Sequence, residues 1–208
     1  MRPIPIAFAI AVIIGLVSCG DRTTDRAVTT AVQAEASAEA ARSKAREEAM
    51  AARETERLAA LWEYADVAVP KGRQLSAVIR STNDVETSGQ GAQSVRLVFR
   101  EHPAWGKSSY LVLSAGDFNC YGGCTVKVIV DEAAPKSMAA RRPPTDEAIA
   151  MFINDFRTLW RFTEGAKRIN IEFPVKAGGA RTATFDVAGL DRSKLPAWDA
   201  ASATNAAR

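Results

Sequence analysis

The chain has 208 residues, of which 47% are hydrophobic, and a formal net charge of +3 at pH 7. A charge this close to zero argues against a nucleic-acid partner, which would need a clustered basic surface. Residues 62–198 alone are enough to bury a hydrophobic core, so one folded domain with accessory segments is expected.

The N-terminal segment has the features of a secretory signal peptide. Basic Arg2 precedes an apolar run over residues 4–17, and the small residue Ser18 precedes Cys19. The run is about 14 residues long, shorter than the roughly 20 that a membrane-spanning helix needs. An uncleaved membrane anchor is the alternative interpretation. Leu-Val-Ser-Cys at residues 16–19 resembles the lipobox of bacterial lipoproteins.

The lipobox resemblance implies a cellular location. Residues 1–18 would be removed as the signal peptide, which lowers the net charge to +2 because Arg2 is lost. Cys19 would become the acylated, palmitate-bearing first residue, and several acyl chains on one cysteine suffice for stable membrane anchoring. Gly20 rather than aspartate follows the cysteine, which implies an outer-membrane lipoprotein facing the periplasm, although Asp21 follows one place later.

Residues 19–61 are expected to form a lipid-anchored leash and a helical spacer. From residue 27 to about residue 64 the chain is rich in Ala, Glu and Arg and lacks Gly and Pro, the composition of a strong helix former. Such a helix would be about 55 Å long. Leu58, Leu61 and Trp62 are expected to hold its last turns against the domain. An alanine-type coiled coil is the alternative, but Leu and Ile at sustained heptad positions are missing.

Residues 62–198 are expected to form an α+β domain, followed by a flexible tail over residues 199–208. Six runs alternate between apolar and polar residues with period two, which indicates strands with one buried face and hence an antiparallel sheet. The expected fold is an antiparallel β-sheet or sandwich of about six strands with one covering helix, preceded by the long Ala-rich helical stalk. The residues expected to face the core are Leu75, Ala77 and Ile79; Val95, Leu97 and Phe99; Leu111 and Leu113; Val126, Val128 and Val130; Ile169, Ile171 and Phe173; and Ala183, Phe185 and Val187.

Turn residues separate these runs. Gly89 and Gly91 lie between the first two, the loop 101–108 lies between the second and third, and residues 177–179 suggest a hairpin between the last two. The loop around residues 120–124 would join the third and fourth.

Cys120 and Cys124 remain as a pair once Cys19 carries lipid. In an oxidising compartment such a pair forms a disulfide, and the two glycines between them permit the positive φ that a tight loop demands. A redox dithiol usually shows C-x-x-C beside a helix, and a closed zinc site needs four ligands. The chain offers only these two cysteines and one histidine, so neither alternative is expected.

One helix is expected to interrupt the sheet. Two prolines at 143 and 144 precede Thr145, Asp146 and Glu147, which would cap and begin it, and Gly165 would end it. Its residues at helical spacing are Ile149, Phe152, Ile153, Phe156, Leu159 and Trp160. They are expected to complete the core, and a ligand groove lined by these aromatics is the alternative.

Residues 62–198 also resemble a loosely characterised group of bacterial envelope and phage-borne lipoproteins. The shared marks are Val-Arg-Leu-Val-Phe-Arg at residues 95–100, Gly-Asp-Phe-Asn-Cys at 116–120, and Phe-Asp-Val-Ala-Gly-Leu at 185–190. A more distant similarity is to accessory proteins of the type VI secretion apparatus. These resemblances imply a small β domain with a cysteine pair and imply no particular activity.

No catalytic, metal-binding or cofactor-binding constellation is expected. Gly-Lys-Ser at residues 106–108 resembles the end of a phosphate-binding loop, but Glu101 stands where that motif needs glycine. His102 is the only histidine and lies in an expected surface turn. Adjacent carboxylates such as Asp131 and Glu132 are typical of turns and caps rather than of general acid–base pairs.

Recognition is the expected role, by aromatic and basic residues of the kind that anchor interfaces. The candidate partner-binding residues are Arg96, Arg100, His102, Trp105, Lys107 and Tyr121. The alternative for Trp105 is a plug at the end of the core. The expected function is therefore a lipid-anchored envelope protein with a non-catalytic periplasmic binding domain for an envelope protein, of the immunity or exclusion type or an envelope-assembly accessory. An enzyme acting on cell-wall material is the alternative.

Overall fold

A computed structural model of the chain describes residues 22–143 and 149–199, with side chains described from residue 33 onwards. The chain divides into two compact units, Met1–Ala49 and Met50–Arg208. Cys19, the expected site of lipidation, and residues 200–208 of the expected tail lie outside the described residues.

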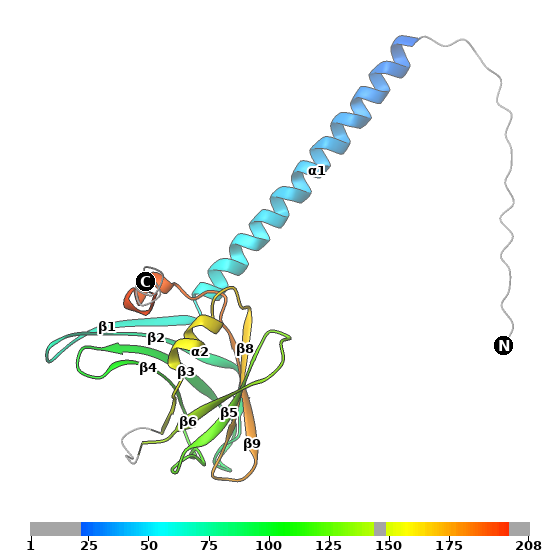
Figure 1. The fold of residues 1–208 in the computed structure, drawn as a ribbon. Helices are drawn as coiled ribbons and strands as arrows, with labels where there is room; N and C mark the ends of the chain where they lie inside the picture. Colours follow the sequence, from blue (N-terminus) through cyan, green and yellow to red (C-terminus); the bar gives the residue numbers. More distant parts are fainter. Residues whose placement is uncertain (1–21, 144–148, 200–208) are drawn as a thin grey trace, which may run out of the picture. The chain divides into compact units, whose positions relative to one another are not determined.

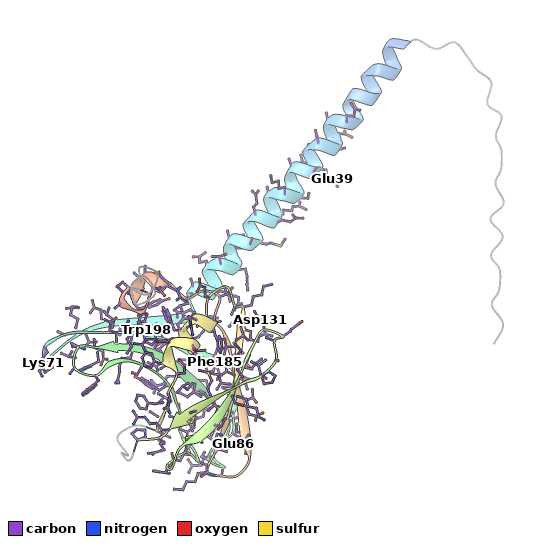
Figure 2. All side chains as sticks on the ribbon, viewed as in Figure 1. Glu39, Lys71, Glu86, Asp131, Phe185 and Trp198 are labelled. Atoms are coloured by element: carbon purple, nitrogen blue, oxygen red, sulfur yellow. A yellow bond between two sulfur atoms is a disulfide. The ribbon has the colours of Figure 1, made fainter. Side chains whose placement is uncertain are left out.

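A single long helix, α1 (Arg22–Ala59), precedes the sheet. Its described side chains are exposed from residue 33 to residue 57, and Glu39 illustrates this in Figure 2. Ion pairs within the helix join Lys44 to Glu48 at 4.0 Å and Arg57 to Glu54 at 2.8 Å. Because alanine, glutamate and arginine have high helix propensity, these residues stay helical without an apolar face to bury. The long helix expected before the domain is confirmed.

The helix ends earlier than its composition suggests. Residues 62–64 were expected to continue the helix, and instead they begin the first strand, in which Trp62 pairs with Ile79. The Trp62 side chain is 5% exposed and contacts Phe99 with ring centroids 6.2 Å apart. Burial of a large aromatic ring in the sheet outweighs the helix propensity of the preceding residues.

Nine strands in the described residues form one antiparallel sheet, shown in Figure 1. In chain order they are β1 (Trp62–Val69), β2 (Gly72–Val85), β3 (Gln93–His102), β4 (Gly106–Val112), β5 (Cys124–Val130), β6 (Lys136–Arg141), β7 (Ala150–Ile153), β8 (Arg168–Pro174) and β9 (Ala180–Asp186). Their order across the sheet is β1-β2-β3-β4-β7-β6-β5-β8-β9. The antiparallel sheet is confirmed, and the expected count of six strands is wrong.

Strands β6 and β7 lie between β4 and β5, so the strands that flank the cysteine loop do not pair with each other. In β7, Met151 and Ile153 join the main core, while Ala150 and Phe152 pack in a second apolar cluster. A strand that is apolar on both faces does not alternate between apolar and polar residues, so a search for period-two alternation does not detect it.

The expected helix over the segment after Pro143 is only partly present. Residues 150–153 are strand, and the helix α2 spans Phe156–Phe162 with Asp155 as its N-cap. The expected cap residues 145–147 lie outside the described residues. Gly165 follows the helix with a φ of +71°, a conformation that glycine adopts without steric cost.

The sheet curls until β9 lies beside the second half of β2. The Asn83 side chain makes two hydrogen bonds there: its Nδ2 donates to the Thr182 carbonyl at 2.9 Å, and its Oδ1 accepts from the Thr184 amide at 2.8 Å. The first half of β2 pairs with β1 instead. The enclosed core includes Phe185, which is fully buried, and Trp198, which is 6% exposed (Figure 2).

The α2 helix and the chain segment around Trp198 cover part of this core. Phe99 of β3 makes edge contacts with Trp160 of α2 at 5.1 Å and with Trp198 at 5.6 Å between ring centroids. A short 3₁₀ helix, η1 (Arg192–Lys194), leads into this segment. The core role expected for Leu159 and Trp160 is confirmed, since both are buried.

The disulfide between Cys120 and Cys124 is present, as expected from the spacing. Gly123, within the closed loop, has a φ of +91°. The loop is therefore the tight turn that the sequence suggests, and Cys124 opens β5.

Candidate binding surface

The outer face of the sheet, meaning the side opposite the main core, carries a row of side chains that crosses five strands. Strand register places these residues directly opposite one another along the row: Val78, Val98, Tyr110, Phe152 and Arg141. The Tyr110 and Phe152 rings pack with centroids 4.8 Å apart. Val98, Val112 and Ala150 are buried around them although they face outward.

Arg100 lies beside this row, opposite Ser108 of β4. Its guanidinium carbon is 5.3 Å from the Trp105 ring centroid and 5.3 Å from the Tyr110 ring centroid. Contacts of this kind attract a cation to the face of an aromatic ring. Burial raises the pKa of the Tyr110 hydroxyl, against the opposing effect of the Arg100 and Arg96 charges, so the hydroxyl stays protonated at neutral pH.

Trp105 is at the tip of the β3–β4 hairpin and is 68% exposed. The interpretation of this residue as a core plug is therefore wrong. One face of its ring stacks on His102, with centroids 3.9 Å apart and planes 14° apart. The stack and the Arg100 contact hold an exposed tryptophan in a defined position.

His102 is not the exposed turn residue that the sequence suggests. It ends β3, is 7% exposed, and its Nδ1 accepts a hydrogen bond from the Ala104 amide at 3.1 Å. The turn is shorter than expected because strand pairing continues through His102 and Gly106. The histidine supports Trp105 and does not itself form an open surface.

A groove of about 580 Å³ lies along these residues. We call it the Arg100 groove, and define it by Arg100, Trp105, Lys107, Ser108, Arg141, Pro143, Phe152, Ile153, Asn154 and Phe156. Lys107, at its end, donates a hydrogen bond from Nζ to the Ala197 carbonyl. Three of the six expected binding residues, Arg100, Trp105 and Lys107, thus line one groove.

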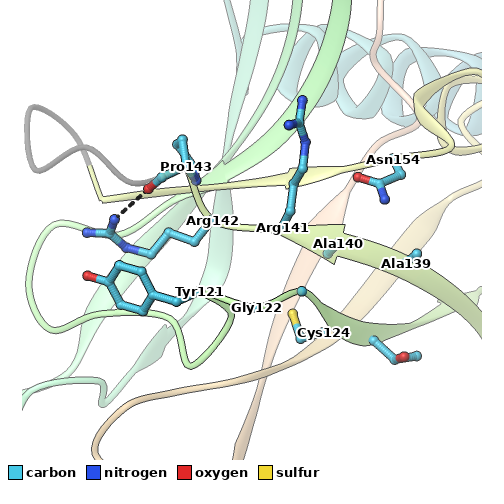
Figure 3. Close-up of a pocket in the computed structure, with 11 residues that line it drawn as sticks. Tyr121, Gly122, Cys124, Ala139, Ala140, Arg141, Arg142, Pro143 and Asn154 are labelled. Atoms are coloured by element: carbon cyan, nitrogen blue, oxygen red, sulfur yellow. Dashed lines mark hydrogen bonds between the residues drawn. The ribbon is translucent and has the colours of Figure 1, made fainter.

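Tyr121 belongs to a neighbouring hollow of about 700 Å³ beside the cysteine loop, shown in Figure 3. Its hydroxyl donates to Asp117 at 2.9 Å, and the Arg142 guanidinium lies 4.6 Å from its ring centroid. Figure 3 also shows the hydrogen bond from Arg142 to the Pro143 carbonyl, and Arg141 pointing away from Arg142. Arg141, Pro143 and Asn154 line both hollows, whereas Tyr121 lines only this one and Trp105 only the Arg100 groove.

Arg96 lies one row further along β3, outside the groove. It is opposite Arg80 on β2 and Val112 on β4, and Arg80 is paired with Glu63 at 3.2 Å. Sequence reasoning placed Arg96 and Arg100 on the same face correctly, since the two residues are four positions apart on one strand. Only Arg100 reaches the aromatic residues of the hairpin.

The groove and row residues that sequence reasoning did not assign to a binding surface include Ser108, Tyr110, Arg141 and Phe152. The two-residue alternation of side chains along β4 could have identified Ser108 and Tyr110, because they alternate with the buried Ser109 and Leu111. The other two lie on β6 and β7, whose position next to β4 was not predictable from local pattern.

In the part of the chain that the structure describes, no cluster of three or more His, Cys, Asp or Glu residues could hold a metal ion. Among the same residues, no helix is long and apolar enough to cross a membrane.

Comparisons with known proteins identify no family. No protein-family model matches the chain, and no curated protein is significantly similar to it in sequence. A solved structure, that of invasion associated protein B from Bartonella henselae, is similar at a TM-score of 0.44 and 14% sequence identity, over 69% of this chain and 94% of that one. We draw neither fold nor function from a similarity at this level.

Proposed function

We propose that this protein is a lipid-anchored lipoprotein of the outer membrane whose periplasmic domain binds another envelope protein without catalysis. The role is either that of an immunity or exclusion protein or that of an accessory to envelope assembly. The observation that carries the binding function is the exposed Trp105, held between His102 and Arg100 at the edge of a groove.

The composition of this surface supports a protein partner. Trp, Tyr and Arg are the residue types most enriched among those that dominate binding energy at protein interfaces. Here the Arg100 guanidinium contacts the rings of both Trp105 and Tyr110. An exposed tryptophan fixed in position loses little conformational entropy when a partner covers it.

The anchor is proposed from the lipobox at residues 16–19. The solvent-exposed α1 helix supports a spacer between a lipidated Cys19 and the β domain, because its described side chains from residue 33 to residue 57 are all exposed. A helix that is polar all round suits a solvated segment.

The test is a pull-down from a cell-envelope extract with the purified full chain. We expect stoichiometric capture of one protein, reduced more than about tenfold by Trp105→Ala, since truncating a central interface residue costs about 2 kcal/mol or more. Met50→Ala is the matched control, because Met50 is an exposed apolar residue on α1, 60% exposed. Capture that is equal for the two variants, or no capture at all, contradicts the proposal.

Growth of a deletion strain separates the two roles. Under the immunity role, deletion sensitises cells to a toxin delivered by sister cells. Under the assembly role, deletion changes the envelope without that sensitivity.

A further inference from the structure

We propose that the Arg100 groove binds an acidic segment of the partner protein, with a carboxylate at Arg100 and a neighbouring apolar side chain on the Tyr110–Phe152 ring pair. This inference rests on the proposed binding function and specifies the chemistry of the partner.

The charge of the groove favours an anionic ligand. The charged side chains that line the groove are Arg100, Lys107 and Arg141, and no carboxylate lines it among the described residues. Within the described ranges, 22–143 and 149–199, neither Arg100 nor Arg141 forms an ion pair. On the same outer face, by contrast, Arg80 is paired with Glu63 at 3.2 Å. Among the described residues, Arg100 and Arg141 thus form a local positive charge with no carboxylate beside it, and an acidic segment would neutralise this charge.

Two donors in the groove are buried and unpaired. Arg100 Nε and Ser108 Oγ have no hydrogen-bond partner among the described residues, and the two residues are directly opposite each other on β3 and β4. A buried donor without an acceptor is unfavourable, and supplying the acceptor recovers that loss. A carboxylate accepts several hydrogen bonds and matches the planar guanidinium fork with its two oxygens.

The position of Arg100 is set before any ligand arrives. Its guanidinium carbon lies at the same distance, 5.3 Å, from the Trp105 and Tyr110 ring centroids. A free arginine side chain loses considerable rotamer entropy on binding, and one already held by two rings loses less. The groove is therefore pre-organised for a charge-assisted contact at this residue.

The apolar row favours a peptide over a glycan. Tyr110 and Phe152 pack together, with Val98, Val112 and Ala150 buried around them. A glycan displays hydroxyl groups along its length, and many of these would be left without partners over such a row. A peptide can instead combine an acidic side chain for Arg100 with an apolar side chain for the ring pair.

Trp105 provides a direct readout of binding. It is 68% exposed, whereas Trp62, Trp160 and Trp198 are at most 6% exposed, so quenching of tryptophan fluorescence by acrylamide reports chiefly on Trp105. The probe is a random glutamate–tyrosine copolymer, added to the purified full chain in a nonionic detergent. Polyglutamate and polyphosphate are the comparison polymers.

We expect the copolymer to protect Trp105 from quenching at a lower concentration than polyglutamate, and the advantage to disappear in Phe152→Ala. Arg100→Gln should raise the half-protecting concentration about tenfold or more, the loss expected when a charge-assisted hydrogen bond is removed. Arg53→Gln is the matched control, because Arg53 is an exposed arginine on α1. Arg100→Lys keeps the charge without the planar fork and should lose part of the effect, and near-UV circular dichroism verifies that each variant is folded.

Three results overturn the inference: no protection by the copolymer, protection that is unchanged in Arg100→Gln, or stronger Arg100-dependent protection by polyphosphate, which would indicate a phosphate-bearing ligand.

The two experiments distinguish a failure of this inference from a failure of the proposed function. If a Trp105-dependent protein is captured in the pull-down but the copolymer neither protects Trp105 nor displaces that protein, the inference is wrong and the binding function stands. If the copolymer binds through Arg100 but no protein is captured, the chemistry of the groove stands and the proposed function is wrong.

Discussion

Arg100 on β3 and Arg142 just after β6 are the same side chain in opposite electrostatic situations. Arg142 is 2% exposed at its side chain and pairs with Asp117, and the same carboxylate accepts from the Phe118 amide and the Tyr121 hydroxyl. Arg100 faces aromatic rings and no described carboxylate. The first arrangement fixes the cysteine loop against the sheet, and the second leaves a cation with no ion-pair partner among the described residues.

The Asp117–Arg142 pair yields a stability prediction. Asp117→Ala should lower the free energy of unfolding by about 3 kcal/mol, because it removes the carboxylate partner of a buried guanidinium. The Asp66–Arg73 pair is the control: both side chains are more than half exposed, so Asp66→Ala should change the free energy by less than about 1 kcal/mol. Urea unfolding of both variants measures the difference, and equal effects would show that burial of the pair does not matter.

At the scale of elements, α2 is too short to be stable by itself and depends on its cap and its packing. A helix of this length is marginal in water without tertiary contacts. In the structure, Leu159 and Trp160 of α2 are buried. Asp155 is the N-cap, and its side chain accepts a hydrogen bond from the Thr158 amide at 3.1 Å. Trp160 Nε1 in turn donates to Asp199 at 2.8 Å.

The Asp155 N-cap leads to a prediction about how the free energy of unfolding depends on pH. The hydrogen bond with the Thr158 side chain is the largest of the effects that lower the pKa of Asp155. A carboxyl group whose pKa is lower in the folded state stabilises fully above its unfolded pKa of about 3.9, and this contribution is lost as the pH falls through the folded value. Asp155→Ala should therefore cost about 1 kcal/mol at pH 7, and the difference from the natural chain should be smaller at pH 2, where the carboxyl group is more fully protonated.

Urea unfolding at both pH values checks this. The control is Glu164→Ala, at the exposed position just after α2, which should change the free energy of unfolding by no more than about 0.5 kcal/mol. A cost of Asp155→Ala that persists unchanged in acid would contradict the role of the ionised cap.

At the scale of the whole molecule, α1 and the β domain differ in how their residues are stabilised. The side chains of α1 from residue 33 to residue 57 are exposed, and intrinsic propensity and local ion pairs support the helix. The β domain buries a continuous core of aromatic and aliphatic residues from the strands, from α2 and from the segment around Trp198.

Lipidation is the prediction that belongs to the entire chain. Cys19→Ser should abolish incorporation of radiolabelled palmitate and release the protein from the membrane fraction, because acyl chains provide the proposed anchor. The double variant Cys120→Ser, Cys124→Ser is the control, since those two sulfurs are joined to each other, and it should remain labelled. Continued labelling of Cys19→Ser would exclude this cysteine as the lipid attachment site.

About two thirds of the strands could be predicted because their pattern is local. Residues such as Val126 and Val128 in β5, or Ile169 and Ile171 in β8, alternate with polar neighbours and are buried as expected. In contrast, β6 relies on Met138 and Ala140, and β7 is apolar on both faces. Neither gives a period-two signal, and the helical spacing of Phe152, Phe156 and Leu159 favoured a longer helix than the one present.

Composition and spacing by themselves determined the long helix, the antiparallel class of the sheet and the disulfide, because propensity, period-two alternation and a tight C-x₃-C loop act over a few residues. Only the tertiary structure decided that Tyr110, Phe152 and Arg141 lie in one row beside Arg100. Those residues are brought together by the insertion of β7 and β6 next to β4, and strand order is set by burial summed over the entire sheet. The candidate groove is therefore a product of register between distant segments, which no single stretch of the sequence contains.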